Sequence, residues 1–421
     1  MIEPLDPAAI GHVLAGRDDV SPALVAMARH LARVFAIRSD TAPGLKLFGA
    51  LLDLPPAFAL ANGTAGFSVT GNGMSEADAL VSCLGEAAEA WSQFEQAGDV
   101  AIRLAHDPAM RGWIGHVVGP MAACLDWVQG ADAFTGSTVH VPADLVWRRA
   151  PSARVIHPPA ALSSGVAAGQ NLEAATERAI LELIERDAAA LWWLAGERPR
   201  EVAASAPGLD GVLAGLSAMR LNCGSRQEYV ARQEYVPRQE YVPRQTWLLD
   251  ITTDIGVPVI AAVSTDRAGC GLAVGVAARL TFASAASAAL REMGQMELSA
   301  AIASAKRAES GDHALNDADL RHLARAAFAA SSCRLLEPDE TRPRPALAAP
   351  AHGESLLEAL ATRHLAICTI DLSRKGIDVP VVRAICPDLQ PFCETAMTAR
   401  MAKAWASHGG GRQHHGGVMP F

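Results

Sequence analysis

The sequence predicts an α+β fold in which layers of sheet and helix occur as duplicated halves. Two observations support this prediction. From residue 46 to residue 400, apolar strand-like runs alternate with alanine-rich helical segments, and no long linker interrupts them. In addition, the run 247–259 is echoed by the run 370–381. Each run is typical of a strand that ends in Asp and a hydroxyl residue, then a turn, then a second strand opened by proline, so we expect two related hairpins.

Composition excludes several classes of protein. The 421 residues carry a formal net charge of -9, with 50% hydrophobic and 19% charged residues, which supports a sizeable core and excludes global disorder. The acidic balance without a basic block argues against nucleic-acid binding. No apolar run reaches the roughly 18 to 20 residues of a membrane helix, and the first residues are acidic where a signal peptide is basic. The eight cysteines form no CxxC pair, which excludes a recognisable zinc module. We expect a soluble cytoplasmic protein.

The chain divides into three expected parts. Residues 1–45 are interpreted as a helical lead-in that packs on the core, because an apolar stripe runs through this segment, which is too short for a domain. Residues 46–400 form the main domain. Residues 401–421 end in glycine-rich sequence, which predicts a flexible tail.

Within the main domain, residues 226–243 repeat a six-residue unit of the form RQEYVP. We favour a duplicated surface loop without a role of its own, since loops tolerate insertion well. The alternative is an edge strand that docks a peptide, because a period of six presents the same strand face in every unit. Pro237 and Pro243 weaken that alternative.

Three predicted helices share one polar signature, which is an acid and a second polar group three residues apart on one helix face. The pairs are Glu86 and Glu89, Glu182 and Glu185, and Glu292 and Gln295. Their neighbours are apolar and small, and a carboxylate among apolar residues needs a partner. A salt-bridge ladder on a solvated helix face is the bland interpretation of any one pair. Three such helices in one chain favour oxygen ligands for Mg²⁺, which binds a few carboxylates together with substrate phosphates.

Glycine-rich segments precede the first two helices. Thr70-Gly71-Asn72-Gly73 comes before the first, and Ser163 to Gln170 before the second. Backbone N–H groups of such loops at a helix N-terminus can hold phosphate oxygens. Neither segment matches the P-loop or the GxGxxG pattern, so each signal is weak alone.

Taken together, these residues resemble the YcaO family of ATP-dependent enzymes that activate peptide amides. The resemblance spans about residues 46–400 and rests on the order of the parts. These are the Thr-Gly-x-Gly segment, the first acid helix, Leu181-Glu182-Leu-Ile-Glu185-Arg186-Asp187, Glu292-x-x-Gln295, and Val379-Pro380-Val-Val-Arg383. The Leu-Glu-Leu-Ile-Glu-Arg-Asp segment is close to a family signature.

The resemblance implies a nucleotide site between duplicated halves, with ATP and Mg²⁺ as cofactors. It assigns Mg²⁺ to Glu86, Glu89, Glu182 and Glu185. It assigns ATP to Thr70, Gly71, Gly73, Gln170, Arg178, Arg186, Glu292 and Gln295. Within this set, Arg186 would neutralise phosphate charge. No catalytic residue is assigned beyond these.

The chain departs from the family pattern at four positions. Asn72 and Ala90 stand where cations are usual, Gln170 where Asn is usual, and Ala174 where an acid is usual. Arg178, one turn before Glu182, can return one positive charge.

Three functions follow from the resemblance. The first is cyclodehydration of Cys, Ser or Thr in a ribosomally made precursor peptide to azolines, as the ATP-using component. The second is a catalytically degenerate scaffold or substrate-binding subunit. The third is formation of a thioamide or amidine by the same activation. We favour catalysis, because acids clustered in an apolar setting more often mark function.

The expected partners are a precursor peptide and a leader-binding protein, E1-like or similar. This expectation rests on the lack of an N-terminal block large enough for peptide recognition. A flavin dehydrogenase in the same complex and a homodimer are further options. Neither nucleic acid nor membrane is expected.

Overall fold

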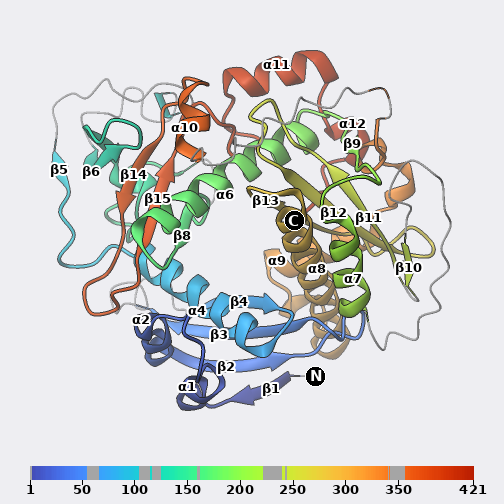
Figure 1. Ribbon diagram of the computed structural model, residues 1–421, viewed down its shortest axis with the longest axis horizontal. Helices are drawn as coiled ribbons and strands as arrows, with labels where there is room; N and C mark the ends of the chain where they lie inside the picture. Colours follow the sequence, from blue (N-terminus) through green and yellow to red (C-terminus); the bar gives the residue numbers. More distant parts are fainter. Residues whose placement is uncertain are drawn as a thin grey trace. The chain divides into compact units, whose positions relative to one another are not determined.

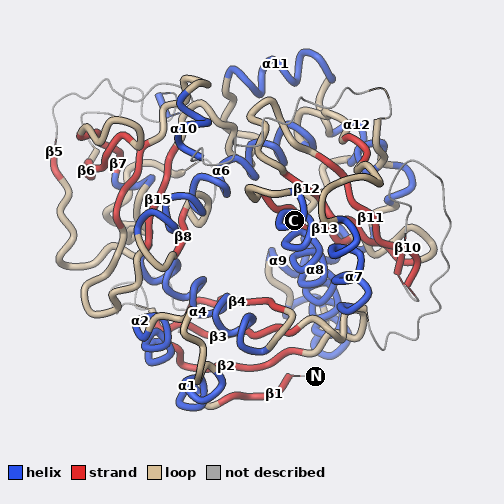
Figure 2. The backbone as a smooth tube through the Cα atoms, in the orientation of Figure 1, coloured by secondary structure: helices blue, strands red, loops and turns tan. Residues whose placement is uncertain are grey.

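The structure is a computed structural model, and it describes residues 2–54, 66–103, 114–115, 125–158, 162–220, 239–241, 244–339, 341 and 356–421. The chain forms two compact units (Figures 1 and 2). The first contains residues 1–37, 46–187 and 355–402, and the second contains residues 38–45, 188–354 and 403–421. In the described part of the chain, no helix combines the length and hydropathy that a membrane crossing requires.

The first unit contains two antiparallel sheets. One has the order β1-β2-β3-β4, and the other has the order β5-β6-β14-β15-β8 with β7 paired to β6. The strands are β1 Ile2–Leu5, β2 Leu31–Ile37, β3 Lys46–Asp53, β4 Gly66–Gly73, β5 Ile102–Arg103, β6 Asp126–Asp132, β7 Thr138–Pro142, β8 Val166–Ala168, β14 Cys368–Asp371 and β15 Val381–Ile385. The helices are α1 Ile10–Val13, α2 Pro22–Ala26, α4 Glu76–Gln93, α10 Leu356–Ala361 and the larger part of α6 Leu172–Trp193. Helix α4 contacts strands of both sheets, namely β3 and β4 in one and β8 and β15 in the other.

The second unit contains one antiparallel sheet of order β10-β11-β12-β13, with β9 also paired to β11. Its strands are β9 Arg200–Glu201, β10 Gln239–Tyr241, β11 Arg244–Asp250, β12 Val259–Asp266 and β13 Ala273–Ala278. Its helices are α7 Leu209–Met219, α8 Phe282–Ser310, α9 Asp317–Ala327, α12 Arg412–His415 and the second half of α11 Ala399–His408. Helix α8 packs on β12 and β13, and α7 and α9 pack on α8 (Figure 1).

The two predicted hairpins form, and they agree down to single hydrogen bonds. In β11–β12, Asp250 lies opposite Ile260, two residues after Pro258. In β14–β15, Asp371 lies opposite Val382, two residues after Pro380. In each hairpin the hydroxyl residue two positions after the Asp accepts a bond from the residue after the proline, at 3.0 Å in one and 3.1 Å in the other. The sequence echo therefore reflects a structural duplication.

The duplication extends to the next strand and helix. Strand β8 pairs antiparallel with β15 and leads into α6, and β13 pairs antiparallel with β12 and leads into α8. In both halves a backbone N–H two residues before the helix cap donates to the proline carbonyl, from Gly169 to Pro380 at 3.0 Å and from Arg279 to Pro258 at 3.1 Å. The expected α+β fold with duplicated sheet-and-helix units is thus present.

The two ends of the chain differ from the expectation. Residues 1–45 were expected to be helical, but they contain β1 and β2, which form part of a sheet in which Val34 and Phe35 suit a pleated surface. The glycine-rich end forms α12 and docks on the end of α6, with the N–H of Gly411 donating to Leu194 O at 2.8 Å. A Cβ at Gly411 would lie 1.6 Å from Trp193 O, so glycine serves close packing there.

Most of the repeat, residues 226–238 with 242–243, lies outside the described residues. The described part, Gln239–Tyr241, forms β10 at one edge of its sheet. The described part of the third six-residue repeat therefore lies in an edge strand.

Candidate active site

The three acid helices are built on one plan. In each helix, a side chain at the N-cap accepts a bond from a backbone N–H three residues later, which satisfies one of the orphan donors of the first turn. The polar pair then follows eleven and fourteen residues after the cap: Glu86 and Glu89 after Ser75, Glu182 and Glu185 after Asn171, and Glu292 and Gln295 after Thr281. This constant spacing places the two groups of each pair about one turn apart on equivalent helix faces.

Glu89 and Arg178 meet at strand β8. The Glu89 carboxylate accepts the N–H of Ala168 at 2.7 Å, and Arg178 Nη1 donates to the carbonyl of the same residue at 3.3 Å. One backbone unit of β8 thus fixes an acid from α4 and a cation from α6. Arg178 is exposed as a residue, and its charge lowers the pKa of Glu89.

Glu182, Glu185 and Arg186 form the second part of the site. Arg186 lies 3.2 Å from the Glu185 carboxylate and 3.8 Å from that of Glu182. The second Glu182 oxygen accepts the N–H of Gly165 at 3.1 Å, which ties α6 to the segment that precedes β8. The ion pairs of the salt-bridge interpretation are therefore present. However, Glu185 is buried and does not lie on a solvated helix face.

The pKa shifts show that the charges of the two parts of the site influence one another. The pKa of Glu182 is raised to about 7, chiefly by loss of hydration and also by the nearby Glu185 and Glu86 charges, against the lowering effect of Arg186. Desolvation also raises the pKa of Glu89, with Glu86 as the next cause. Desolvation by the surrounding protein raises the pKa of Glu86 too, although part of that side chain stays open to solvent. These acids outnumber the arginines beside them, and their surroundings disfavour the charged forms.

The donor set fits Mg²⁺ that arrives with a nucleotide. Within the described ranges, no three His, Cys, Asp or Glu side chains converge closely enough to hold a metal ion by themselves. Mg²⁺ is usually bound through one or two carboxylates plus substrate phosphates and waters, so a complete protein cage is not needed. Carboxylates whose mutual repulsion raises their pKa gain most from such a cation, and Arg186 and Arg178 are suited to phosphate oxygens.

The glycine-rich segment before α4 is not the loop that the sequence suggested. Thr70, Gly71 and Gly73 belong to β4, where they pair with residues 46–49 of β3. A Cβ at Gly71 would lie 2.1 Å from the backbone nitrogen of Cys83 on α4, and one at Gly73 would lie 2.5 Å from that of Ala79. Close packing of helix on strand explains these glycines, and contact with a nucleotide stays a prediction for them and for Thr70.

Gln170 has a local contact. Its side-chain amide donates to the carbonyl of Asp19 at 3.0 Å, which links the start of α6 to the turn after α1. Glu292 and Gln295 belong to the second unit, where a Glu292 carboxylate oxygen accepts the N–H of Val276 on β13 at 3.0 Å. Their place in a nucleotide site also stays a prediction.

Arg383 was quoted in the motif but not assigned to the site. It is buried in β15, and it donates to the carbonyls of Val146, Ser164 and Leu162. Its pKa is lowered to about 9, chiefly by desolvation and against the raising effect of the Glu182 charge. It therefore holds the segment next to Gly165, whose N–H binds Glu182. A single arginine in an otherwise apolar buried strand was the available signal.

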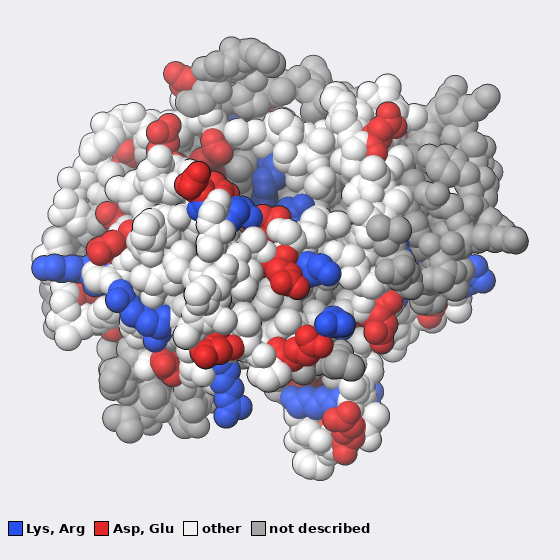
Figure 3. Space-filling view, turned by 60° about the horizontal axis from the view of Figure 1, so that its bottom comes forward, with Lys and Arg blue, Asp and Glu red and all other residues white. Residues whose placement is uncertain are grey.

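Charges of both signs lie on one face of the molecule. On the face shown in Figure 3, the Lys and Arg side chains of the described residues are interspersed with Asp and Glu. A continuous basic stripe, which phosphate backbones require, is not formed by the described residues on that face.

Comparison with known protein families finds the family that the sequence resembles. Residues 70–390 match the family described as YcaO cyclodehydratase, ATP- and Mg²⁺-binding. The match confirms the resemblance, and with it ATP and Mg²⁺ as the expected cofactors. No curated protein matches the chain by sequence.

Three solved structures share the fold. A heterocyclase in complex with substrate and cofactor is 19% identical at a TM-score of 0.68, and the match covers 100% of this chain and 59% of the heterocyclase. The YcaO protein of Methanopyrus kandleri, bound with AMPPCP and Mg²⁺, is 20% identical at a TM-score of 0.57, with 92% of each chain covered. A chain of the microcin synthetase complex of E. coli is 13% identical at a TM-score of 0.53, with 85% of this chain and 88% of that chain covered.

At these identities the likeness concerns the fold alone, and it confirms the α+β class. This chain spans about three fifths of the length of the heterocyclase.

Proposed function

Because this chain belongs to the YcaO family of cyclodehydratases, we propose that it activates backbone amides of a ribosomally made peptide with ATP. The reaction that we favour converts Cys, Ser or Thr residues to azolines. The observation that carries the proposal is the cluster of Glu86, Glu89 and Glu182, in which desolvation raises each pKa and the Glu86 charge further raises the pKa of Glu89 and of Glu182. Such a cluster needs a cation, and a Mg²⁺–nucleotide supplies one. We assign the activity to residues 46–400.

The reaction joins the Cys, Ser or Thr side chain to the preceding amide carbon and removes the amide oxygen. ATP, when bound, supplies the phosphoryl group with which this oxygen leaves as phosphate, so the peptide loses one water per ring. The chain contributes positions and charges rather than a nucleophile. Glu86, Glu89, Glu182 and Glu185 would hold Mg²⁺. Arg186 and Arg178 would neutralise phosphate charge.

Retention of four acids favours an enzyme over a scaffold. Asn72, Ala90 and Ala174 remove two cations and one acid from the family arrangement. The position of Arg178, with its guanidinium anchored on Ala168 beside Glu89, allows it to restore one cation. We therefore expect weakened but measurable use of nucleotide. A thioamide or amidine product follows from the same activation if the attacking group comes from outside the peptide.

The test is to incubate the protein with ATP, Mg²⁺, its partner and a precursor peptide from a neighbouring gene, and then to weigh the peptide. The partners that we propose are a leader-binding E1-like protein and, for oxidation of the rings, a flavin dehydrogenase. Loss of one water per modified residue with phosphate release supports the cyclodehydratase. A mass shift that matches sulfur for oxygen points to thioamidation. Failure to bind nucleotide in calorimetry, even with partner and peptide, leaves the scaffold.

A further inference from the structure

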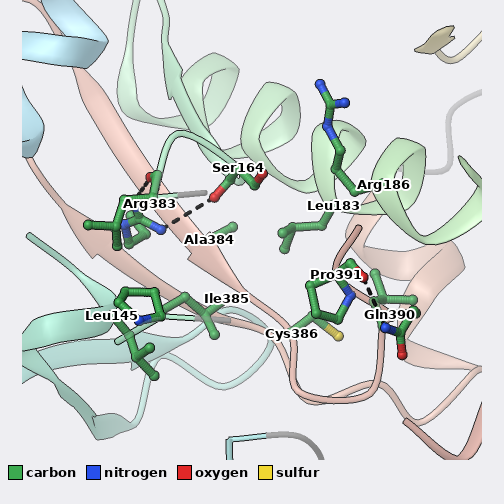
Figure 4. A pocket seen from close by; sticks show the side chains of 13 residues that line it. Leu145, Ser164, Leu183, Arg186, Arg383, Ala384, Ile385, Cys386, Gln390 and Pro391 are labelled. Atoms are coloured by element: carbon green, nitrogen blue, oxygen red, sulfur yellow. Dashed lines mark hydrogen bonds between the residues drawn. The ribbon is translucent and has the colours of Figure 1, made fainter. Parts of the chain in front are cut away.

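The first unit contains a cavity between helix α6 and strand β15, shown in Figure 4. Its volume is about 50 Å³, and most of its lining is apolar. The apolar side chains include Leu145, Leu162, Leu183, Ile385 and Pro391. Figure 4 shows Leu183 on the cavity side of its helix, directed toward the strand.

The charged and amide groups of the wall already have hydrogen-bond or ion-pair partners within the protein. Arg383 donates to three backbone carbonyls, and the Gln390 amide donates to Pro391 O and Ala396 O while its oxygen accepts from Thr398. The guanidinium of Arg186 extends away from the cavity in Figure 4 and is paired with Glu185 and Glu182. Groups satisfied in this way do not favour a charged occupant, so the cavity is suited to an apolar one.

The cavity adjoins the glutamate cluster. Leu183 directly follows Glu182, and the stem of Arg186 lines the cavity while its head pairs with the glutamates. Gly165, which donates to Glu182, packs so closely here that a Cβ would lie 2.5 Å from Ala384 O and 2.8 Å from Leu183. A peptide held at the cluster therefore has the cavity beside it.

The size of the cavity restricts the occupant. A water molecule needs about 10–15 Å³ of volume in this measure, so 50 Å³ accommodates about three or four non-hydrogen atoms. The side chains of alanine and valine fit within that number. An adenine ring and a phenylalanine side chain are far larger, so the cavity does not suit the base of a nucleotide.

We propose that this cavity accepts a small aliphatic side chain, of alanine or valine size, from the peptide substrate held at the glutamate cluster. The proposal rests on the proposed function and adds a specificity-determining pocket to it. Leu183 sets the size of the pocket, because it is directed into the cavity and is only half-buried. It can therefore be replaced with little damage to the core.

The test uses synthetic peptides Gly-Gly-X-Cys-Gly-Gly, in which X is Gly, Ala, Val or Phe. Their binding to the protein loaded with Mg²⁺ and a non-hydrolysable ATP analogue is measured by saturation-transfer NMR. Each buried methyl group should tighten binding roughly fourfold, so Ala and Val bind more tightly than Gly and Phe does not. Equal binding of all four peptides overturns the proposal.

Variants at one position connect the preference to the cavity. L183F fills the cavity and should remove the gain for Ala and Val, and L183A enlarges it and should extend the gain to Phe. L183M, which nearly conserves volume, is the control and should keep the preference. Nucleotide affinity, measured by calorimetry, should stay within about twofold in all three variants, because the proposal assigns Leu183 to the peptide and not to the nucleotide.

Two results contradict the proposal in different ways. A preference that survives L183F means that the side chain lies elsewhere. A loss of nucleotide affinity in L183F with unchanged peptide preference means that the cavity belongs to the nucleotide. Failure of the proposed function itself looks different, because wild-type protein would then bind no Mg²⁺–nucleotide in the same calorimetry.

Discussion

Two clusters of charged side chains in this protein are built from the same residue types and behave in opposite ways. In the first unit, Glu86, Glu89, Glu182 and Glu185 share Arg178, Arg186 and Arg383. In the second unit, Glu297 of α8 binds Arg220 at 2.6 Å through each of its oxygens and binds Arg244 at 3.0 Å. Carboxylates outnumber guanidiniums in the first cluster, and guanidiniums outnumber the carboxylate in the second.

The balance of charge decides the direction of each pKa. Desolvation raises the pKa of Glu182 to about 7. Glu297 is even less exposed to water, but Arg220 and Arg244 hold its pKa at about 2. Thr41 and Ser264 also donate to Glu297, so its oxygens are saturated by the protein. A buried acid that is outnumbered by its cations is therefore structural, whereas acids that outnumber their cations can bind a further cation from outside the protein.

The largest expected effect is on the structural cluster. Replacing Glu297 with Gln leaves two buried guanidiniums without a counter-charge, and breaking such a pair costs about 3–5 kcal/mol. Urea unfolding of E297Q against wild type measures this loss of free energy of unfolding. E309Q, an exposed position on the same helix, is the control and should change it by no more than about 0.5 kcal/mol. Equal stability of E297Q and E309Q would remove the distinction between the clusters.

The second effect is on activity. We expect E182Q and E185Q to lower nucleotide turnover by about a hundredfold or more, because each removes charge that positions the Mg²⁺. The apo form of E182Q should be at least as stable as wild type, since the change relieves repulsion. Phosphate release and urea unfolding are the measurements, with E173Q at an exposed position on α6 as control. Loss of cooperative unfolding in E182Q would identify it as a structural ion-pair residue instead.

The third effect is a dependence of stability on pH. The folded pKa of Glu297, about 2, lies below its usual value of 4.5, so the unfolded chain takes up the proton first. The stability that Glu297 contributes is therefore complete above about pH 4.5 and falls by about 3 kcal/mol as the pH drops to 2. Denaturant unfolding across this range tests it. The fall should persist in 0.5 M salt, which screens exposed charges and leaves buried pairs largely unaffected; a fall abolished by salt would assign it to surface pairs.

How far sequence predicts this molecule depends on the kind of signal. The acid helices and the hairpins were predictable, because periodicity and proline spacing are local and both copies obey the same rules. The glycines of β4 and the tail were misread. Gly71 and Gly411 serve close packing against distant segments, and glycine at a tight contact looks in sequence like glycine in a loop. The roles of Arg383 and of the Glu297 cluster depend on partners far away in the chain, so no local pattern indicates them.

The smallest expected effect concerns the repeat. Residues 221–243 connect Arg220 to Arg244, and both arginines bind Glu297, so this segment begins and ends at one buried anchor. Excising 226–243 joins Ser225 to Arg244 and preserves the anchor, while it removes β10, an edge strand of three residues. Shortening a loop changes its closure entropy only slowly with length, so stability should change by no more than about 1 kcal/mol and activity should stay near wild type.

A matched excision of 226–237 keeps β10. If both proteins fold and only the larger excision lowers activity tenfold, the edge strand contacts substrate or partner; if both lower it, the repeat itself has that role.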